Sequence, residues 1–195
     1  KSERKFAVYL PPDYETSQRN YPVLYLLHGM GDDQTGWIQF GEILRIADKA
    51  ILEGNATPMI IIMPDANTNR IGYFNSINNN WRYEDFFFEE FMPHVEKKYR
   101  IKREKRFRAI AGLSMGGGGS FIYAMHRPEL FSSACPLSAY VGPLSIDDAK
   151  DDLTKYNNNP SYEDSKLKPY FERHNALSLI ENTEIEKLKS VRWFI

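Results

Sequence analysis

The chain has 195 residues, a formal net charge of -1 and a hydrophobic content of 42%. This length fits a single domain over residues 1–195 with a sizeable core. The balanced charge gives no reason to expect a nucleic-acid partner, and no apolar segment is long enough to span a membrane. Cys135 is the one cysteine, so an intrachain disulfide is excluded and a buried structural thiol is expected.

Apolar runs alternate with helical patterns, which predicts an α/β fold with a mostly parallel sheet and helices on both faces. The run 21–28 is almost entirely apolar, as is typical of a strand buried on both faces. Helices are predicted over residues 42–52 and 83–99, and Pro93 must kink the second or mark its first half. The predicted strands span residues 5–10, 21–28, 59–63, 106–111, 131–137 and 191–195.

Two stretches have no regular pattern. Residues 67–81 are rich in asparagine and aromatic residues and follow a strand, where α/β proteins place binding loops. Residues 140–175 form a long polar stretch that we expect to be an inserted lid, interrupted by Pro160 and Pro169. Four aromatic residues give this lid something to bury, namely Tyr156, Tyr162, Tyr170 and Phe171.

Basic residues are concentrated between the end of the second helix and the next strand. Because cations are favourable at a helix C-terminus, we expect a solvated surface there and not a nucleic-acid contact. The residues are Lys97, Lys98, Arg100, Lys102, Arg103, Lys105, Arg106 and Arg108.

The most informative motif is G-x-S-x-G at residues 112–116, directly after an apolar run. A strand that breaks at such a motif and continues as a helix is a nucleophile elbow. Gly112 and Gly116 leave room for the strand and the helix to approach each other, and Ser114 is held exposed at the helix N-terminus. The motif predicts acyl transfer through a covalent ester on Ser114.

Other interpretations of these residues are less consistent with their context. A flexible glycine linker would not be bracketed by an apolar strand and by the helix-forming residues 121–125. A phosphate-binding loop would need Gly-Lys followed by Ser or Thr, and these residues do not follow the glycines.

A second motif, residues 28–33 (His-Gly-Met-Gly-Asp-Asp), follows the second predicted strand. The oxyanion of a tetrahedral intermediate needs two N–H donors. One is expected from Met115, directly after the serine, and the other from the loop 28–33, whose glycines allow a close backbone approach. The alternative is an ordinary turn at the end of a strand.

Residues 21–33, Trp37 and residues 109–117 together resemble the esterase family that contains esterase D, the feruloyl and acetyl xylan esterases of carbohydrate esterase family 1, and the antigen 85 mycolyltransferases. The resemblance runs from about residue 5 to the end of the chain. It implies an α/β-hydrolase fold with Ser114 as the nucleophile. The implied oxyanion hole is the backbone N–H of Met115 with that of Met30, for which Gly29 is the alternative.

The resemblance also implies that the catalytic acid and histidine follow a strand like residues 191–195. We therefore expect this chain to be the N-terminal portion of the catalytic domain. The missing C-terminal segment is a possible partner as a separate piece. An internal alternative keeps the required order with His174 as base and Asp147 or Asp148 as acid.

The remaining histidines are assigned structural roles: His28 in its loop, His94 on the surface or at a cap, and His126 against the carbonyl groups at the end of its helix. No cofactor is implied. The histidines and the cysteine are isolated and lack the spacing of metal ligands, so no metal site is expected.

The predicted activity is the hydrolysis of a carboxylic ester on a small molecule or a polysaccharide. By resemblance the first candidates are feruloyl or acetyl groups on xylan, in a secreted or periplasmic protein. The aromatic residues of the segment 67–81 suit an aromatic acyl group or a sugar, although ordinary loop packing would also account for them. Alternatives are a thioesterase like S-formylglutathione hydrolase, an acyltransferase like the mycolyltransferases, and a non-catalytic carbohydrate-binding relative.

Overall fold

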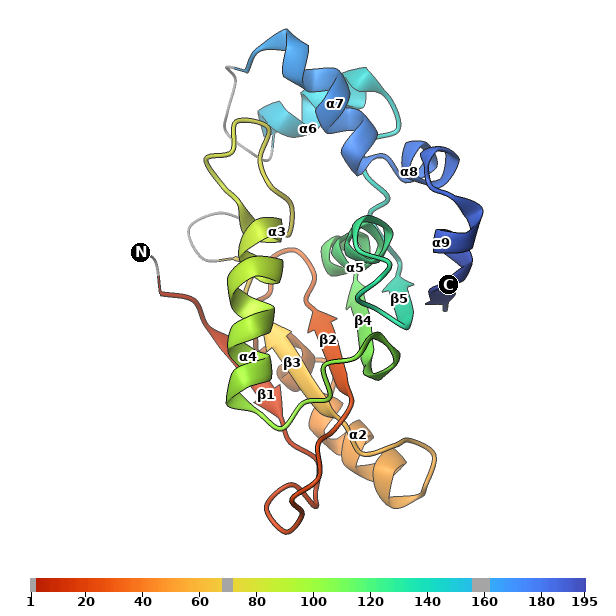
Figure 1. The fold of residues 1–195 in the computed structure, drawn as a ribbon. Coiled ribbons are helices and arrows are strands. Elements are labelled where there is room, and N and C mark those ends of the chain that lie inside the picture. Colours follow the sequence, from red (N-terminus) through yellow and green to blue (C-terminus); the bar gives the residue numbers. More distant parts are fainter. Residues whose placement is uncertain (1–2, 68–71, 156–161) are drawn as a thin grey trace.

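The computed structural model describes residues 3–67, 72–155 and 162–195. These residues form a six-stranded sheet in the order β1-β3-β2-β4-β5-β6 (Figure 1). Strand β1 is antiparallel to β3, and the other neighbouring pairs are parallel. The strands are β1 (Phe6–Tyr9), β2 (Val23–Leu27), β3 (Ile60–Pro64), β4 (Arg108–Leu113), β5 (Ser133–Leu137) and β6 (Arg192–Trp193).

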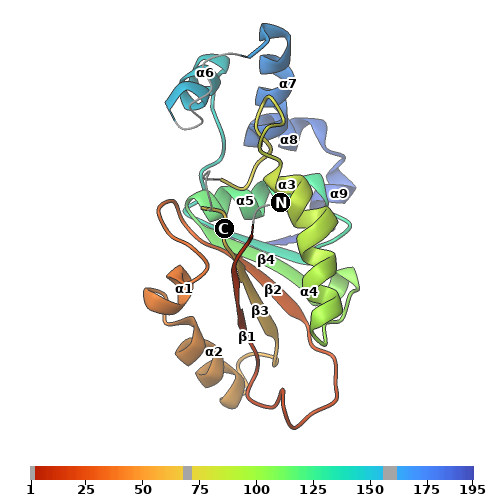
Figure 2. The same cartoon turned by 90° about the vertical axis from the view of Figure 1, so that its left-hand side faces the viewer.

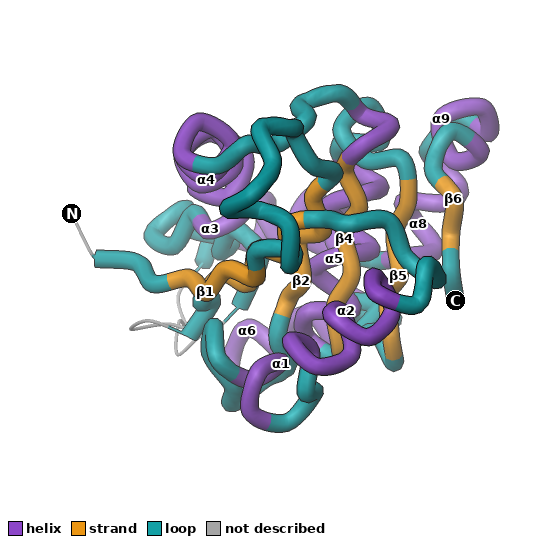
Figure 3. Tube along the Cα trace, turned by 90° about the horizontal axis from the view of Figure 1, so that it is seen from below, coloured by secondary structure: helices purple, strands orange, loops and turns teal. Residues whose placement is uncertain are grey.

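Helices cover both faces of the sheet, as predicted (Figures 2 and 3). In β2, Tyr25 and Leu27 point into the core beneath α4 and α5, whereas Leu26 points toward α1 and α2. This alternation explains why the strand is apolar at every position. The helices are α1 (Gly36–Gln39), α2 (Ile43–Leu52), α3 (Tyr83–Phe86), the π-helix η1 (Phe87–Phe91), α4 (Met92–Lys98), the 3-10 helix η2 (Lys105–Phe107), α5 (Met115–His126), α6 (Ile146–Lys155), α7 (Asp164–His174), α8 (Ala176–Asn182) and α9 (Ile185–Lys189).

The register of the central strands brings the two sequence motifs together. Leu27 in β2 pairs with Gly112 in β4, so both strands end at the same edge of the sheet. The loop after β2 and the turn after β4 therefore lie side by side. In Figure 1 the parallel strands point toward the end of the molecule that carries α6 and α7.

The predicted helix over residues 83–99 is present, with a change of winding in the middle. A π-helical turn, η1, separates α3 from α4, and Pro93 lies in the first turn of α4. Because proline has no N–H to donate to the preceding turn, the wider turn accommodates it without ending the helix.

The stretch 140–175 is more regular than expected. Most of its described part forms α6 and α7, and Pro169 lies inside α7 instead of ending a helix. Burial of apolar side chains from both helices stabilises α7 despite the proline. Pro160 and Tyr156 lie outside the described residues. The side chains of this small core are Ile77, Ala149, Leu153, Leu167, Tyr162, Tyr170 and Phe171.

Two smaller expectations are corrected. The basic segment is not simply a solvated surface, because Arg108 forms a nearly buried ion pair with Glu96 at 2.7 Å and Arg100 stacks on the ring of Tyr14. Cys135 is half-buried rather than buried, at the edge of the core under α1 and α2. Helices α8 and α9 were not predicted.

Candidate active site

Ser114 occupies the strand-to-helix turn that its motif predicts. Its φ angle of 54° lies in the left-handed region, and the residue is exposed. Its N–H donates to the carbonyl oxygen of Leu137 at 2.9 Å, which fixes the turn against β5. A Cβ atom on Gly112 would collide with the backbone of Gly116, and one on Gly116 would collide with the backbone of Leu27. The two glycines are therefore required for the elbow to close.

The two expected oxyanion donors lie beside this serine. Met115 is the first residue of α5, where a helix leaves its N–H groups without partners inside the helix. Met30 follows β2, is 56% exposed, and lines the same cavity as Ser114 and Met115. The structure thus brings together all three site residues that the motifs indicate.

A cavity of about 280 Å³ opens above the serine. Its wall comes from three parts of the chain: the elbow with the loop after β2, the segment 72–81, and the segment 140–174. Five of the side chains are aromatic, so the wall offers flat apolar surfaces. The lining residues are Met30, Gly72, Tyr73, Phe74, Asn75, Ser76, Trp81, Ser114, Met115, Tyr140, Pro143, Asp152, Tyr170 and His174.

Tyr73 ties the aromatic part of this wall to the loop after β2. Its ring is buried, and its hydroxyl donates to the carbonyl oxygen of His28 at 3.2 Å. Its own carbonyl oxygen accepts from the hydroxyl of Tyr123 in α5. The segment 72–81 is therefore bonded both to the loop after β2 and to helix α5, which lie on either side of Ser114.

Two histidines have the structural roles that were expected. His28 is buried, and its Nε2 accepts from the N–H of Ala66 at 2.9 Å while its Nδ1 faces the carbonyl oxygen of Gly29 at 2.8 Å. Both ring nitrogens are thus engaged in holding the loop. His94 is exposed on α4 with its ring edge against Phe6.

His174 lines the cavity but does not contact Ser114. Its Nδ1 donates to the carbonyl oxygen of Tyr170 at 2.8 Å, and its Nε2 is buried with no partner among the described residues. The acids considered for it are elsewhere: Asp147 pairs with Lys150 on the surface of α6, and Asp148 is exposed. The structure does not assemble the internal triad from these residues.

Burial lowers the pKa of His174 to about 4, below the ordinary value of about 6.5. The unfolded chain therefore takes up this proton at a higher pH than the folded chain. The stability that the neutral ring contributes is complete above about pH 6.5 and is lost as the pH falls toward 4.

We expect the free energy of unfolding of the native protein to fall by about 2 kcal/mol more than that of His174→Phe between pH 7 and pH 5. Urea denaturation of both proteins at the two pH values measures this difference. If the free energy of unfolding fell equally in the two proteins, the lowered pKa of His174 would be contradicted.

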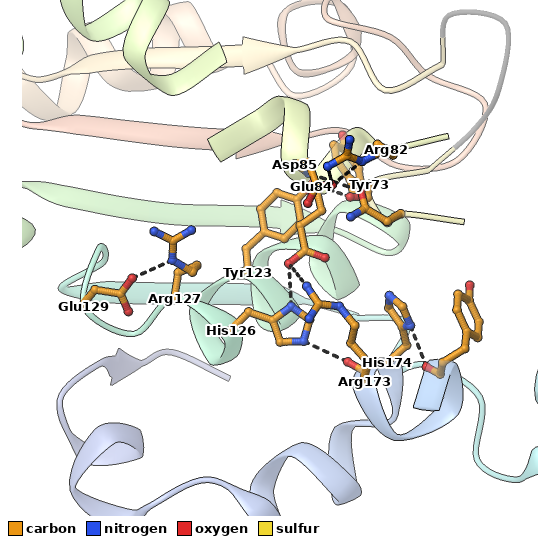
Figure 4. A network of polar contacts seen from close by, with 12 residues as sticks. Tyr73, Arg82, Glu84, Asp85, Tyr123, His126, Arg127, Glu129, Arg173 and His174 are labelled. Atoms are coloured by element: carbon orange, nitrogen blue, oxygen red, sulfur yellow. Dashed lines mark hydrogen bonds and ion pairs between the residues drawn. The ribbon is translucent and has the colours of Figure 1, made fainter. Parts of the chain in front are cut away.

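His126, the last residue of α5, does not bond to the carbonyl groups at the end of its own helix. Its Nδ1 lies 2.7 Å from Oε1 of Glu84, and its Nε2 lies 3.0 Å from the carbonyl oxygen of Arg173 (Figure 4). Sequence reasoning missed Glu84 and Arg173 because they lie 42 and 47 residues from His126. No local pattern connects positions so far apart.

Within the described ranges, no group of three or more histidine, cysteine or acidic side chains is placed to hold a metal ion. Among the same residues, none of the helices is both long and apolar enough to cross a bilayer.

The mostly parallel sheet, the strained serine turn at the ends of its central strands and the cavity above it define an α/β-hydrolase. A profile of the family described as "Putative esterase" matches residues 1–192. The chain belongs to this esterase family.

Two curated relatives illustrate the similarity. The chain is 37% identical over 133 residues to an endo-1,4-beta-xylanase/feruloyl esterase of Xylanibacter ruminicola, a match that covers 64% of this chain and 18% of the relative. It is 39% identical over 144 residues to the esterase Rv1288 of Mycobacterium tuberculosis, covering 71% and 29%. The chain thus matches less than a third of the length of either relative.

Solved structures agree with the fold. A ferulic acid esterase superposes with a TM-score of 0.79 at 31% identity, covering 98% of this chain and 76% of that one. An S-formylglutathione hydrolase from Agrobacterium tumefaciens gives 0.71 at 20% identity, covering 99% and 80%. A feruloyl esterase module from Clostridium thermocellum, solved as a mutant with sinapinate, gives 0.61 at 19% identity, covering 96% and 73%.

Proposed function

We propose that the protein hydrolyses carboxylic esters through an acyl intermediate on Ser114, and that its acyl group is a hydroxycinnamoyl group such as feruloyl. The observation that carries the proposal is the position of Ser114: exposed, at φ 54°, on the floor of a cavity that Met30 and Met115 also line. A serine in a sparsely populated backbone region beside helix N–H groups fits a nucleophile with a preformed oxyanion site.

The chemistry follows from this arrangement. The Oγ of Ser114 attacks the ester carbonyl carbon and gives its proton to a general base. The N–H groups of Met115 and Met30 stabilise the negative charge on the carbonyl oxygen in the tetrahedral intermediate. The alcohol leaves with the proton from the base, and water then releases the acid from Ser114 by the same steps in reverse.

The general base of this proposal comes from outside residues 1–195. His28 has both ring nitrogens engaged, and His94 is exposed on α4. His126 lies at the far end of α5, about 16 Å along the helix axis from Met115. The ring of His174 is 6.4 Å from that of His126, centroid to centroid, and its Nδ1 is bonded to the carbonyl oxygen of Tyr170.

The cavity wall supports an aromatic acyl group. Phe74 and Trp81 from the segment 72–81 face the same cavity as Tyr140 and Tyr170 from the segment 140–175. A planar acyl chain gains more from such surfaces than an acetyl group does, because it buries more apolar area. The relatives named as feruloyl esterases, at 37% and 31% identity, support the same choice.

The segment 140–175 is the lid of this proposal. Helices α6 and α7 stand beyond the ends of the strands, over the same end of the sheet as the elbow (Figures 1 and 2). Tyr140, Pro143 and Tyr170 of this segment line the cavity with Ser114. The segment thus forms one side of the acyl-binding pocket.

Steady-state kinetics of the full-length protein tests the proposal. We expect that kcat/KM divided by the uncatalysed rate is higher for methyl ferulate than for p-nitrophenyl acetate. We also expect the KM for methyl ferulate to rise roughly tenfold in Phe74→Ala. Phe40→Ala is the matched control, because Phe40 is 76% exposed at the C-terminal end of α1 and is not among the residues that line the cavity. An unchanged KM in Phe74→Ala would place the acyl group elsewhere.

The same assay separates the alternatives. Faster turnover of S-formylglutathione than of methyl ferulate would favour a thioesterase. A new ester formed in the presence of a sugar acceptor would favour an acyltransferase. Binding of xylo-oligosaccharides without turnover of any ester would favour a carbohydrate-binding relative.

A further inference from the structure

Three charged side chains from three elements meet at the far end of α5 from Ser114 (Figure 4). Oε1 of Glu84, in α3, lies 2.7 Å from Nδ1 of His126 and 2.9 Å from the guanidinium of Arg173, in α7. The side chains of Glu84 and His126 are 4% and 9% exposed, whereas that of Arg173 is 51% exposed. The cluster thus joins the lid helix α7 to the body of the protein through a nearly buried centre.

Both ring nitrogens of His126 face oxygen atoms that accept hydrogen bonds. Its Nε2 lies 3.0 Å from the backbone carbonyl oxygen of Arg173, which can only accept a hydrogen bond. Burial opposes the ionisation of Glu84, but the hydrogen bond from His126 and the charges of His126 and Arg173 outweigh it and hold the Glu84 pKa below its usual value. Both acceptors therefore require an N–H, and only the doubly protonated imidazolium makes both bonds.

These bonds act on the end of α7 that faces the substrate cavity. Arg173 directly precedes His174, which lines the cavity. The chain on the other side of His174 is also fixed. The side-chain amide of Asn175 donates to the carbonyl oxygen of Pro143 at 2.7 Å, and the backbone N–H of Ala176 donates to the carbonyl oxygen of Val141 at 3.1 Å. The bond from His126 connects this end of α7 directly to α5.

We propose that the imidazolium of His126 is a positioning residue for the acyl-binding pocket, because its second N–H fastens the backbone of α7 to α5. Loss of this proton removes one of the two bonds and loosens the wall formed by Tyr170 and His174. The part of the proposal that concerns substrate rests on the proposed ester hydrolysis. The attachment of α7 does not.

An unperturbed histidine changes its charge between about pH 5 and 8, and several other titratable groups lie around His126. His174 is neutral there because burial lowers its pKa to about 4, and burial raises the pKa of Tyr123 well above its usual value. Asp85 pairs with Arg82, and Arg127 pairs with Glu129. Glu89, on η1, lines the cavity of about 200 Å³ beside the cluster. Because both partners of the ring are acceptors, the attachment needs both N–H groups of His126 and weakens once the ring has lost one of them.

Amide hydrogen exchange over residues 164–174 of the full-length protein tests the attachment without any need for turnover. After correction for intrinsic rates, we expect protection of α7 to fall about tenfold from pH 5 to pH 8, as for the loss of one hydrogen bond from a charged donor to a carbonyl oxygen. In His126→Gln the protection should be low and independent of pH. His94→Gln is the matched control, since His94 is exposed on α4, and it should behave like the native protein.

A second variant keeps the test informative if His126→Gln does not fold. Arg173→Gln changes a half-exposed side chain but leaves the backbone carbonyl oxygen that His126 bonds to. It should lower the protection of α7 at every pH and retain the fall with rising pH. Native protection that does not change with pH, or a fall that survives in His126→Gln, would overturn the proposal.

The kinetic readout separates this inference from the proposed function. In the native protein KM for methyl ferulate should rise severalfold with pH relative to KM for p-nitrophenyl acetate, whose small acyl group does not reach α7, and kcat should not follow the same curve. His126→Gln should remove this difference. Absence of ester turnover would refute the proposed function while the exchange result still stands, and exchange that is independent of pH would refute the attachment while turnover persists.

Discussion

Replacing Ser114 with alanine should lower the kcat for any ester substrate of the full-length protein by roughly 10⁴-fold or more, since the step that forms the acyl intermediate loses its nucleophile. The fold should persist. Alanine also has a Cβ atom, so it tolerates the positive φ angle at this position no better and no worse than serine does. The hydrogen bond from the backbone N–H at this position to the carbonyl oxygen of Leu137 is unaffected. Initial rates measure the first expectation and circular dichroism the second. Labelling with a fluorophosphonate probe should be lost together with the serine hydroxyl.

Ser120→Ala is the matched control for this experiment. Ser120 lies in the same helix, but it is buried and its hydroxyl donates to the carbonyl oxygen of Gly117 at 2.8 Å. It should retain labelling and most of the activity while losing some stability. A folded Ser114→Ala protein that remains active would refute the role of the serine.

The largest effect on stability is expected from Gly116→Ala. The added Cβ would lie 2.5 Å from the carbonyl oxygen of His28 and would also collide with the carbonyl oxygen of Leu27. Both are backbone atoms, which cannot move away by a change of rotamer. Helix α5 would have to move away from β2, so we expect a loss of about 3 kcal/mol or more in the free energy of unfolding. Urea denaturation measures the loss.

Gly29→Ala provides the comparison for stability, because its Cβ would meet only the carbonyl oxygen of Leu113 at the ordinary distance of 3.7 Å. It should change the free energy of unfolding by much less than Gly116→Ala. Similar losses in the two variants would mean that the close approach of α5 to β2 is not what Gly116 provides.

The central strands and the elbow could be predicted because their determinants are local. A run such as 21–28 has nearly every side chain apolar since both faces of β2 are covered, and the two glycines of residues 112–116 are needed where the chain turns. The meeting of Ser114 and Met30 followed from one further rule, that parallel strands end at the same edge of a sheet.

What escaped prediction depends on contacts between distant residues. Helix α7 contains Pro169 and is mostly polar, and the packing of Leu167 against α6 and Ile77 is what stabilises it. In the sequence, Glu84 is one of several acidic residues in a predicted helix, and only the fold brings it into contact with His126. Tertiary contacts of this kind override local propensity and leave no periodic signal.

The hydrogen bonds of Tyr73 connect the aromatic wall of the cavity to the loop after β2 and to α5. The aromatic wall formed by Phe74 and Trp81 belongs to the same short segment as Tyr73, whose hydroxyl holds the carbonyl oxygen of His28, two residues before Met30. An ester that pushes this wall outward therefore also displaces the turn that carries the proposed oxyanion donor. We expect poorly fitting acyl groups to be discriminated in the rate of the chemical step as well as in binding, so that selectivity appears in kcat and not in KM alone.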